Sequence, residues 1–396
     1  MKVCVYATPA ALFGAGIERF ARMLLKHLPS IAPDIDFVYY YYYLPLRHFF
    51  LYENRPKILK LYETNVKQIL LPMPRKLTEP VFEFFNINHS IFYGNVDIFY
   101  TPDYIYPKKK DEILVNTIHD VCLLKYSEFM SDEIFKTQSF YINKGIKEAK
   151  HIITISETSK KDIMEYLNIP SEKISVIYVG FDIPNDKEDN ICKDVRKDLL
   201  QKINCEYILS VGSINPRKNY IGLLKAYRIL IDRGYKLDLI IAGNKGWKNE
   251  EFFESIKELK LLNKVSVFTQ VSNTELRILY SNASIFVFPS FYEGFGIPPL
   301  EASSYSLPVV CSDTSSMPEV MGDSALYVNP YEPEDIAEKM IMVIDDSELR
   351  SRLIKNGKEN IKRFSWERAA SDLADVFRKV YGQFHQRKQK YNSIYL

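Results

Sequence analysis

The stretch SIFVFPSFYEGFGIPPLEASSYSLPVVCSD, residues 284–313, decides the fold of this chain. It begins with an apolar run, Ile285–Phe288, which a proline and a serine close and which predicts a buried strand. A loop with Gly294 and Gly296 follows, and then two prolines of the kind tolerated in a first helical turn. A second apolar strand is predicted over Pro308–Ser312. This order of strand, tight loop, helix and strand is half of a nucleotide-binding α/β unit, whose ligand lies at the carboxyl ends of the strands.

Two carboxylates bracket the loop. Glu293 and Glu301 are eight residues apart, and a carboxylate can accept two hydrogen bonds from the vicinal diol of a ribose or a hexose. Glycines let the backbone approach a ligand, and free N–H groups at a helix start favour anions. The simpler interpretation is a loop glutamate and a second glutamate that favours the helix dipole. The whole string, with E-x7-E inside EGFGIPPLE, resembles the GT-B glycosyltransferases of family 4, which include many bacterial retaining mannosyl- and glucosyltransferases.

Length and composition limit the class of protein. The 396 residues are enough for two or three domains, and 46% hydrophobic with 26% charged residues is ordinary for a globular protein. A net charge of +2 gives no overall signal for a nucleic acid partner. Five scattered cysteines favour reduced thiols in a cytosol over a zinc site or a disulfide framework.

The N-terminal segment predicts the start of a Rossmann-like domain. A strand over Lys2–Ala7 precedes a loop with Gly14 and Gly16, and apolar residues then recur at helical spacing from Ile17 to Leu28. A cleaved signal peptide is disfavoured, since glycines and a proline interrupt the apolar stretch, and no apolar run reaches the length of a membrane span. We therefore expect a cytoplasmic protein. The family resemblance places this loop near the donor phosphates and the acceptor, although Glu18 stands where the family has a glycine.

Tyrosines crowd the next predicted strand, Asp36–Leu44, and aromatic character continues over Arg47–Tyr52. We interpret this strand as part of a core; the alternative is an exposed aromatic patch for a lipid-linked acceptor or a membrane. Asp34 and Asp36 match a D-x-D metal motif, but they precede their strand, whereas a site loop should follow one. We interpret them as a solvated turn.

A histidine and an aspartate, His119 and Asp120, directly follow a strand predicted over Ile113–Ile118. Such residues face the crevice of a doubly wound sheet, although a single histidine is often structural. The family has the same pair, and the resemblance implies that His119 reaches the transferred sugar while Asp120 supports it.

A basic pair marks the second domain, which begins with a strand at Tyr207. Arg217 and Lys218 directly precede a helical stripe, where the helix dipole disfavours cations unless an anion lies between them. A solvated basic loop is the simpler interpretation. Residues Gly212 to Asn219 match the family pattern G-x-x-x-x-R-K-N, whose Arg and Lys bind the nucleotide diphosphate, and the resemblance places Val271 near the base.

We therefore expect an α/β protein of the GT-B class, with two Rossmann-like parallel-sheet domains facing across a cleft. The first domain is expected over residues 1–185, and a C-terminal helix at about 366–396 joins it. A polar linker is expected from Pro184 to Lys202, and the second domain is expected over residues 203–365. The last helix carries a basic tail that either is solvated or rests on anionic lipid, with Arg378, Lys379, Arg387, Lys388 and Lys390.

The resemblance implies glycosyl transfer with a nucleoside diphosphate as the leaving group and no metal. Glu293 is expected at the sugar and Glu301 at the ribose. The predicted catalytic residues are His119, Arg217, Lys218 and Glu293, and the predicted donor-binding residues are Gly14, Gly16, Gly212, Val271, Gly294, Phe295, Gly296, Ile297 and Glu301.

The forms HD, NPRKN and GNKGW look most like bacterial mannosyltransferases of O-antigen and other surface polysaccharides. GDP-mannose is the first expected donor and a UDP-hexose the second, with a saccharide or lipid-linked saccharide as the acceptor. The alternatives are a GT-B nucleotide-sugar epimerase, a phosphorylase, and a two-domain sugar-binding protein without activity. The last would lack the basic pair and would usually carry an export signal.

Overall fold

A computed structural model describes residues 1–12, 16–42, 66–71, 80–82, 84–85, 87–104, 112–182 and 195–392, the last helix being described only as backbone beyond residue 385. The chain divides into two compact units. The first contains residues 1–121, 136–180 and 364–396, and the second contains residues 122–135 and 181–363. The short segment Cys122–Phe135 therefore packs with the second unit, although the first unit surrounds it in sequence.

The first unit is built on a parallel sheet in the strand order β3-β2-β1-β4-β5-β6-β7. Its strands are β1 (Lys2–Tyr6), β2 (Asp36–Tyr42), β3 (Lys67–Leu71), β4 (Ile98–Thr101), β5 (Ile113–Thr117), β6 (His151–Thr154) and β7 (Ile174–Val176). Its helices include α1 (Ile17–Ile31), α4 (Ser90–Tyr93), α7 (Glu157–Leu167) and α16 (Trp366–Asn392). Residues 136–148 of α6 (Asp132–Glu148) also belong to this unit, whereas the start of that helix is assigned to the second unit. The order reverses between β1 and β4, as in a Rossmann-like domain.

The tyrosine-rich strand β2 lies in the core of the first unit. Residues Tyr39 to Tyr42 are at most 2% exposed. Tyr39 donates a hydrogen bond to the carbonyl of Leu25 on α1, whereas Tyr40 bonds the ring of His89 on the other face of the sheet. The prediction of a core strand is confirmed, and the alternative of an exposed patch is wrong for Tyr39 to Tyr42. Residues 47–52 lie outside the described part of the chain.

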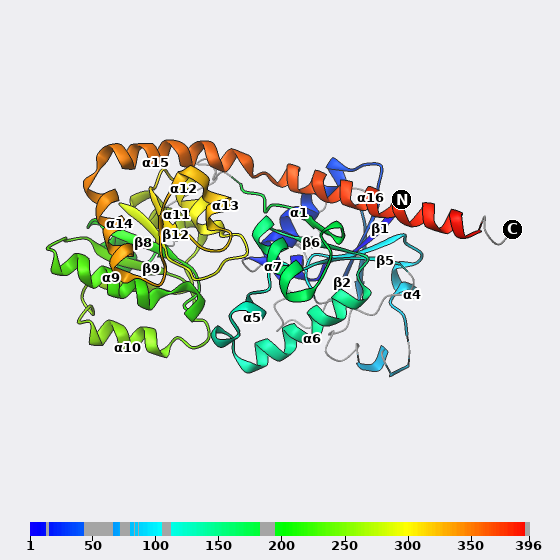
Figure 1. Ribbon diagram of the computed structural model, residues 1–396, viewed down its shortest axis with the longest axis horizontal. Coiled ribbons are helices and arrows are strands. Elements are labelled where there is room, and N and C mark those ends of the chain that lie inside the picture. The colour runs from blue at the N-terminus through cyan, green and yellow to red at the C-terminus, as the bar shows by residue number, and fades with distance from the viewer. Residues whose placement is uncertain are drawn as a thin grey trace. The chain divides into compact units, whose positions relative to one another are not determined.

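The C-terminal helix belongs to the first unit, where α16 packs along α1 (Figure 1). Trp366 at its start is 1% exposed, and a side chain on Gly180 would collide with its ring. Further along, Arg378 donates to the exposed carboxylate of Asp34 at 2.6 Å. Asp34 of the D-x-D sequence is thus part of a surface ion pair. No helix in the described part of the chain is both long and apolar enough to cross a bilayer.

The second unit is built on a parallel sheet in the order β10-β9-β8-β11-β12-β13. Its strands are β8 (Tyr207–Val211), β9 (Asp238–Ala242), β10 (Val265–Phe268), β11 (Ile285–Phe288), β12 (Val309–Ser312) and β13 (Ala325–Val328). Its helices are α5 (Cys122–Lys125), α8 (Lys197–Lys202), α9 (Tyr220–Asp232), α10 (Glu250–Glu258), α11 (Asn273–Asn282), α12 (Ile297–Ser304), α13 (Met317–Met321), α14 (Pro333–Asp345) and α15 (Ser347–Asn360). Helix α8 occupies the end of the segment expected to be a linker, and residues 183–194 lie outside the description.

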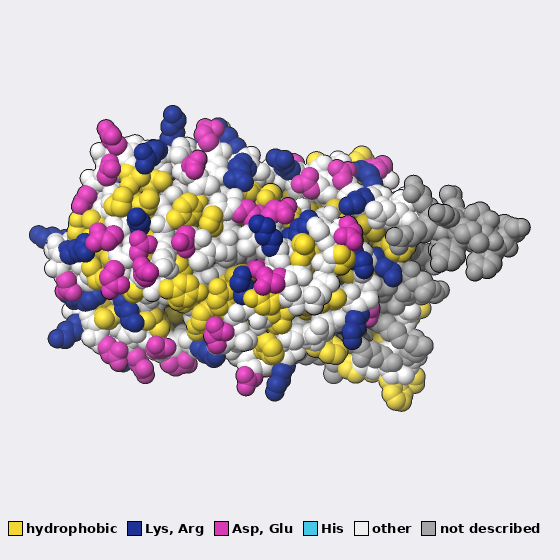
Figure 2. Space-filling view, viewed as in Figure 1, with side chains coloured by type: hydrophobic (Ala, Val, Ile, Leu, Met, Phe, Trp, Pro, Cys, Tyr) yellow, Lys and Arg dark blue, Asp and Glu magenta, His cyan; other side chains and the backbone are white. Residues whose placement is uncertain are grey.

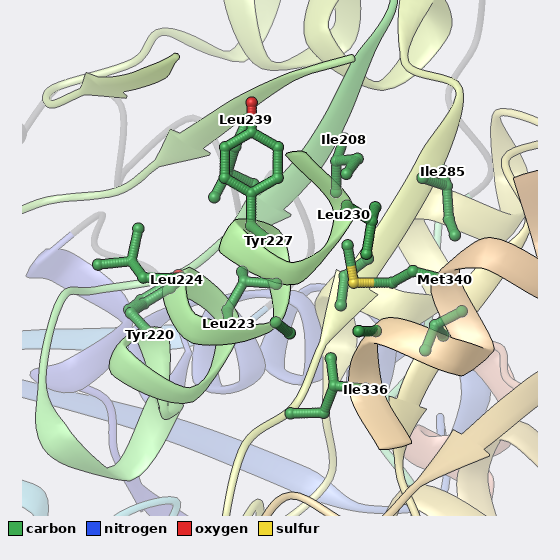
Figure 3. Close-up of a cluster of buried hydrophobic side chains, with 14 of the residues drawn as sticks. Ile208, Tyr220, Leu223, Leu224, Tyr227, Leu230, Leu239, Ile285, Ile336 and Met340 are labelled. Carbon is green, nitrogen blue, oxygen red and sulfur yellow. The ribbon is translucent and has the colours of Figure 1, made fainter. Parts of the chain in front are cut away.

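A hydrophobic core covers one face of this second sheet. Leu230 of α9 lies beside Met340 of α14, and Tyr227 of α9 lies beside Leu239 of β9 (Figure 3). These residues recur at helical spacing on each helix and in apolar runs on each strand, so each element buries one side in the shared core. Figure 1 shows α12 and α15 on the face of the sheet opposite α9.

Strand order places the candidate site. In the sheet of the second unit the chain first adds strands to one side of β8 and then, from β11 on, to its other side. Open α/β sheets bind ligands at the switch point between two such strands, here β8 and β11. The loops that follow these two strands contain Gly212–Asn219 and Pro289–Gly296. Basic and acidic side chains are interspersed over the face of the molecule in Figure 2, and no large patch of one sign stands out on that face. The electrostatic analysis below therefore concerns the charged side chains of those two loops.

Candidate functional site

A buried ion cluster joins the two loops at the switch point. The Arg217 guanidinium donates to one carboxylate oxygen of Glu293 at 2.7 Å, and the Lys218 ammonium donates to the other at 2.7 Å. Arg217 also donates to the carbonyl of Tyr292 at 2.7 Å. Glu293 is 6% exposed and Lys218 is 9% exposed. The structure therefore brings together three of the four predicted catalytic residues in one contact set.

Electrostatics keep the Glu293 carboxylate of this cluster ionised. Burial by itself would raise the pKa of Glu293, but Arg217 and then Lys218 bring it down to about 2. Burial lowers the pKa of Lys218, and Glu293 opposes that shift. The Lys218 ammonium also lies 4.5 Å from the ring centre of Phe288 at the end of β11. A carboxylate of this chain thus occupies the anion position that the basic pair predicted.

The two cations directly precede helix α9, as predicted from the sequence. They lie in the short 3-10 turn Pro216–Lys218, and Asn219 caps the helix by accepting from the N–H of Gly222 at 3.2 Å. The Asn219 amide donates to the carbonyl of Pro289 at 3.0 Å and to that of Pro330 at 2.6 Å. One asparagine therefore holds the loop after β8 against the loop after β11.

The glycine loop is fixed by close packing. Gly296 has a φ of 92°, which strains any residue with a side chain, and a side-chain carbon there would also displace the Met317 methyl group, 2.0 Å away. The single hydroxyl hydrogen of Ser316 is shared between the carbonyls of Glu293 and Phe295, at 2.9 and 3.0 Å, and Ser315 accepts from the Glu293 N–H at 2.9 Å. The backbone from Gly294 to Ile297 consequently enters α12 in one defined conformation.

The second glutamate of E-x7-E lies inside α12 and has a different partner. Tyr280 donates its phenolic hydrogen to Glu301 at 3.0 Å. The Tyr280 ring stacks on Tyr305 with centres 5.5 Å apart and planes 5° from parallel. Burial first, and then the charge of Glu301, raise the pKa of Tyr280, so the phenol stays protonated and keeps donating.

Two further predicted donor residues border the same sheet edge. Gly212 follows β8 with a φ of 153°, and a side chain there would meet the Lys218 chain at 3.2 Å and the Tyr220 hydroxyl at 3.3 Å. Val271 follows β10 and precedes α11, which begins with a capping box between Ser272 and Glu275. Gly212 thus lies next to the ion cluster, whereas Val271 lies at the end of a different strand.

The remaining predicted residues belong to the first unit. His119 is 8% exposed, its Nε2–H donates to the carbonyl of Pro102 at 2.9 Å, and its ring meets Phe20 edge-to-face at 5.1 Å. Burial lowers the pKa of His119, which keeps the ring neutral at pH 7. Gly16 is the residue before α1 and has a φ of 64°. Gly14 lies outside the described residues.

Sequence reasoning missed the residues that hold this site in place. Asn219, Tyr280, Ser315 and Ser316 were not among its candidates, although Asn219 ends the R-K-N pattern and the two serines precede the turn at Met317. Only the hydroxyl pattern beside a known loop could have drawn attention to the serines. Among the described residues, no group of three His, Cys, Asp or Glu side chains is placed to hold a metal ion.

Solved structures share the fold. Sucrose-phosphate synthase from Thermosynechococcus elongatus has a TM-score of 0.69 at 18% identity, over 97% of this chain and 100% of that one. HepE from Anabaena, solved in complex with UDP and glucose, has a TM-score of 0.68 at 17% identity, over 96% of this chain and 100% of that one. Two Rossmann-like parallel-sheet domains with this similarity define the GT-B class of glycosyltransferase folds.

Sequence comparison gives the family. Residues 193–360 match the family described as Glycosyl transferases group 1, and residues 14–184 match Glycosyltransferase Family 4. O-antigen chain mannosyltransferase B of Escherichia coli is 30% identical over 288 residues, 71% of this chain and 74% of that protein. O-antigen chain mannosyltransferase RfbU of Salmonella typhimurium is 34% identical over 241 residues, 61% of this chain and 63% of that protein. The chain belongs to the group 1 glycosyltransferases, as its motifs predicted.

Proposed function

We propose that this glycosyltransferase moves mannose from GDP-mannose onto a saccharide or lipid-linked saccharide acceptor during assembly of a bacterial surface polysaccharide of the O-antigen type. The bond between the anomeric carbon and the diphosphate oxygen breaks, and the anomeric carbon bonds to an acceptor hydroxyl oxygen. The hydroxyl proton passes to the leaving diphosphate. We also propose that configuration is retained, as is usual for the family that the motifs resemble.

The buried cluster of Arg217, Lys218 and Glu293 carries this proposal. Charge builds on the diphosphate as the glycosidic bond breaks, and two preorganised cations beside the Gly294–Ile297 amides would stabilise it. In this proposal the cations act in place of a metal ion, and chelators should leave turnover unchanged. Glu293 would release the cations to the diphosphate and turn its oxygens to the sugar hydroxyls.

The other predicted residues have roles in the same scheme. We assign Glu301 to the two ribose hydroxyls, with Gly212 and Val271 lining the nucleotide and Gly14 and Gly16 near the phosphates and acceptor. His119, neutral because it is buried, is assigned to a hydroxyl of the transferred sugar. Its Nε2–H is already donated to Pro102, so Nδ1 is the atom left to accept from that hydroxyl.

The donor sugar is proposed from relatives. Both of the O-antigen relatives above are named mannosyltransferases. The Anabaena structure holds UDP and glucose, which makes a UDP-hexose the second candidate donor. A nucleotide-sugar epimerase or a phosphorylase on the same fold, and a sugar-binding protein without activity, remain distinct alternatives.

One assay separates these functions. The protein is incubated with GDP-mannose, UDP-glucose, UDP-galactose or UDP-N-acetylglucosamine, with and without mannose oligosaccharides, and released nucleotide and product are measured. Acceptor-dependent GDP release with an α-linked mannose product supports the proposal. UDP release would transfer the assignment to a UDP-hexose donor, an isomerised sugar nucleotide would indicate an epimerase, and binding without release would indicate a sugar-binding protein. A product of inverted configuration would reject retention.

We further propose that the basic tail contacts the inner face of the membrane. Arg378 is already held by Asp34 and Asp375, so the proposal rests on Lys379, Arg387, Lys388 and Lys390. Each basic side chain near anionic lipid contributes about 1 kcal/mol. Sedimentation with phosphatidylglycerol vesicles should weaken in high salt and on deletion of Arg387 to Lys390. Equal sedimentation of the truncated and intact proteins would reject this role.

A further inference from the structure

A cavity of about 300 Å³ opens in the second unit beside the ion cluster but does not include it. Asn215, Pro216 and Asn219 of the loop after β8 line it, whereas Arg217 and Lys218 do not. The start of α9, the start of α10 and the segment Pro330–Pro333 complete its walls. Its volume lies at the lower end of the range of about 300–1,000 Å³ for small-molecule sites.

Three aromatic rings form one wall of this cavity. Phe129 stacks on Phe291 with ring centres 5.4 Å apart, and Phe291 meets Tyr331 with centres 4.9 Å apart at 30°. Tyr331 is 59% exposed, a large fraction for an aromatic residue at a cavity rim. An apolar ring wall of this kind suits the C–H face of a pyranose, which offers an equally flat apolar surface.

The polar groups of the cavity are of both signs, and one of them lacks a partner. Lys225 and Glu251 both line it, so their charges favour neither an anion nor a cation. Asn215 is 5% exposed, and its side-chain oxygen has no hydrogen-bond partner among the described residues. A buried amide oxygen without a donor is costly, and a hydroxyl group supplied by a ligand would satisfy it after a small opening of the loop.

The helix start in this cavity does not act as a phosphate site. The Gly222 N–H of the first turn of α9 already donates to the capping Asn219 side chain. The nearby Lys248 ammonium donates to the carbonyl of Glu128 at 2.7 Å. With these donors engaged, and with Lys225 and Glu251 opposite in charge, the cavity offers an aromatic wall and hydrogen-bonding groups without a net charge that would select an ion.

From these observations we propose that the cavity is a second saccharide subsite, which binds a neutral hexose residue of the acceptor chain away from the reacting end. The identity of that chain rests on the proposed function, whereas the existence of the subsite rests on the aromatic wall and Asn215. Occupancy of the subsite by a longer acceptor would lower its KM, because a second contact is made without a further loss of rotational freedom.

The test uses the full chain and the variant Tyr331→Ala, with Tyr166→Ala as the control. Tyr166 is a half-exposed tyrosine on α7 of the first unit, 38% exposed and outside the cavity. Methyl α-mannoside and α-linked mannose di-, tri- and tetrasaccharides are titrated by calorimetry, and GDP is titrated in parallel. Matched glucose and galactose oligosaccharides extend the panel.

We expect Tyr331→Ala to weaken binding of the longer oligosaccharides about five- to tenfold and to leave GDP affinity unchanged, while Tyr166→Ala changes neither. Ile221→Trp, which fills the cavity from α9, should do the same. Wild-type oligosaccharide affinity in both cavity variants, with GDP binding intact, would overturn the subsite. Cavity-dependent binding of oligosaccharides without any GDP-mannose turnover would keep the subsite and reject the proposed donor instead.

Discussion

The two glutamates of E-x7-E are chemically alike, yet the protein holds them by opposite means. Glu293, on the loop after β11, accepts hydrogen bonds from two cations on the loop after β8, and these cations lower the pKa of its carboxyl group to about 2. Glu301 lies eight residues on, within α12, and is held by the neutral phenol of Tyr280. The difference is that two cations balance the charge of Glu293, whereas a neutral hydroxyl group donates to Glu301; under the proposed function the first arrangement serves the diphosphate and the second serves the ribose.

The largest loss of activity is expected when a cation beside Glu293 is removed. Arg217→Ala removes one of the two cations that we assign to the developing negative charge on the diphosphate. Turnover at saturating donor should fall by roughly 10²–10³ in kcat, as it does when one oxyanion-stabilising donor is removed. Arg228→Ala is the matched control, because Arg228 is on the surface of α9 and pairs with Asp232. Full turnover by Arg217→Ala would show that Arg217 does not stabilise the leaving diphosphate.

The next prediction concerns the pH dependence of stability. The pKa of Glu293 is about 2 in the folded protein and about 4.3 in an unfolded chain, so its contribution is present above pH 5 and is lost as the pH falls towards 2. That contribution is roughly 3 kcal/mol. Urea unfolding between pH 5 and pH 2.5 should therefore show a shallower loss of stability for Glu293→Gln than for the wild type.

The control for the pH experiment is Glu258→Gln, a change at an exposed carboxylate on α10. The same experiment exposes the cost of the cluster, since Glu293→Gln leaves two buried cations without a negative partner and should lower stability at pH 7. Parallel pH profiles for the wild type and Glu293→Gln would show that the cluster does not set the charge of Glu293.

The proposed role of Glu301 is tested by measuring GDP affinity. Glu301→Gln should weaken GDP by about one to two decades, because hydrogen bonds to a charged group contribute about 1.5–3 kcal/mol. Glu293→Gln should not weaken GDP, since the change makes the site more positive, but it should lower kcat through the lost sugar contact. Titration of both variants with GDP, alongside kcat, is the measurement. If Glu293→Gln loses as much GDP affinity as Glu301→Gln, the division of roles fails.

The fold class and both glutamates could be predicted from the sequence, but the contact partners of the two glutamates could not. Apolar runs and glycine loops located several strands of each sheet, with ends that differed slightly from those observed, as at Ile113–Thr117, where the prediction continued to Ile118. The basic pair at Arg217 and Lys218 predicted an anion between them. That the anion is Glu293, 75 residues away from Lys218, depends on β8 and β11 being neighbours, which no local pattern encodes. The same limit hid Tyr280, whose contact with Glu301 depends on how α11 packs beside α12.

The smallest loss of GDP affinity is expected when the hydroxyl group that donates to Glu301 is removed. Tyr280→Phe keeps the ring that stacks on Tyr305 and removes only the hydroxyl that holds Glu301. GDP affinity should fall by a few-fold, since the Glu301 carboxyl group loses one hydrogen bond that orients it. If Tyr280 acts only through that carboxylate, Tyr280→Phe should have almost no further effect on GDP binding in a Glu301→Gln background. Calorimetric GDP titration of the wild type, both single variants and the double variant measures this coupling. Fully additive losses would show that Tyr280 supports the fold around α11 and not the position of Glu301.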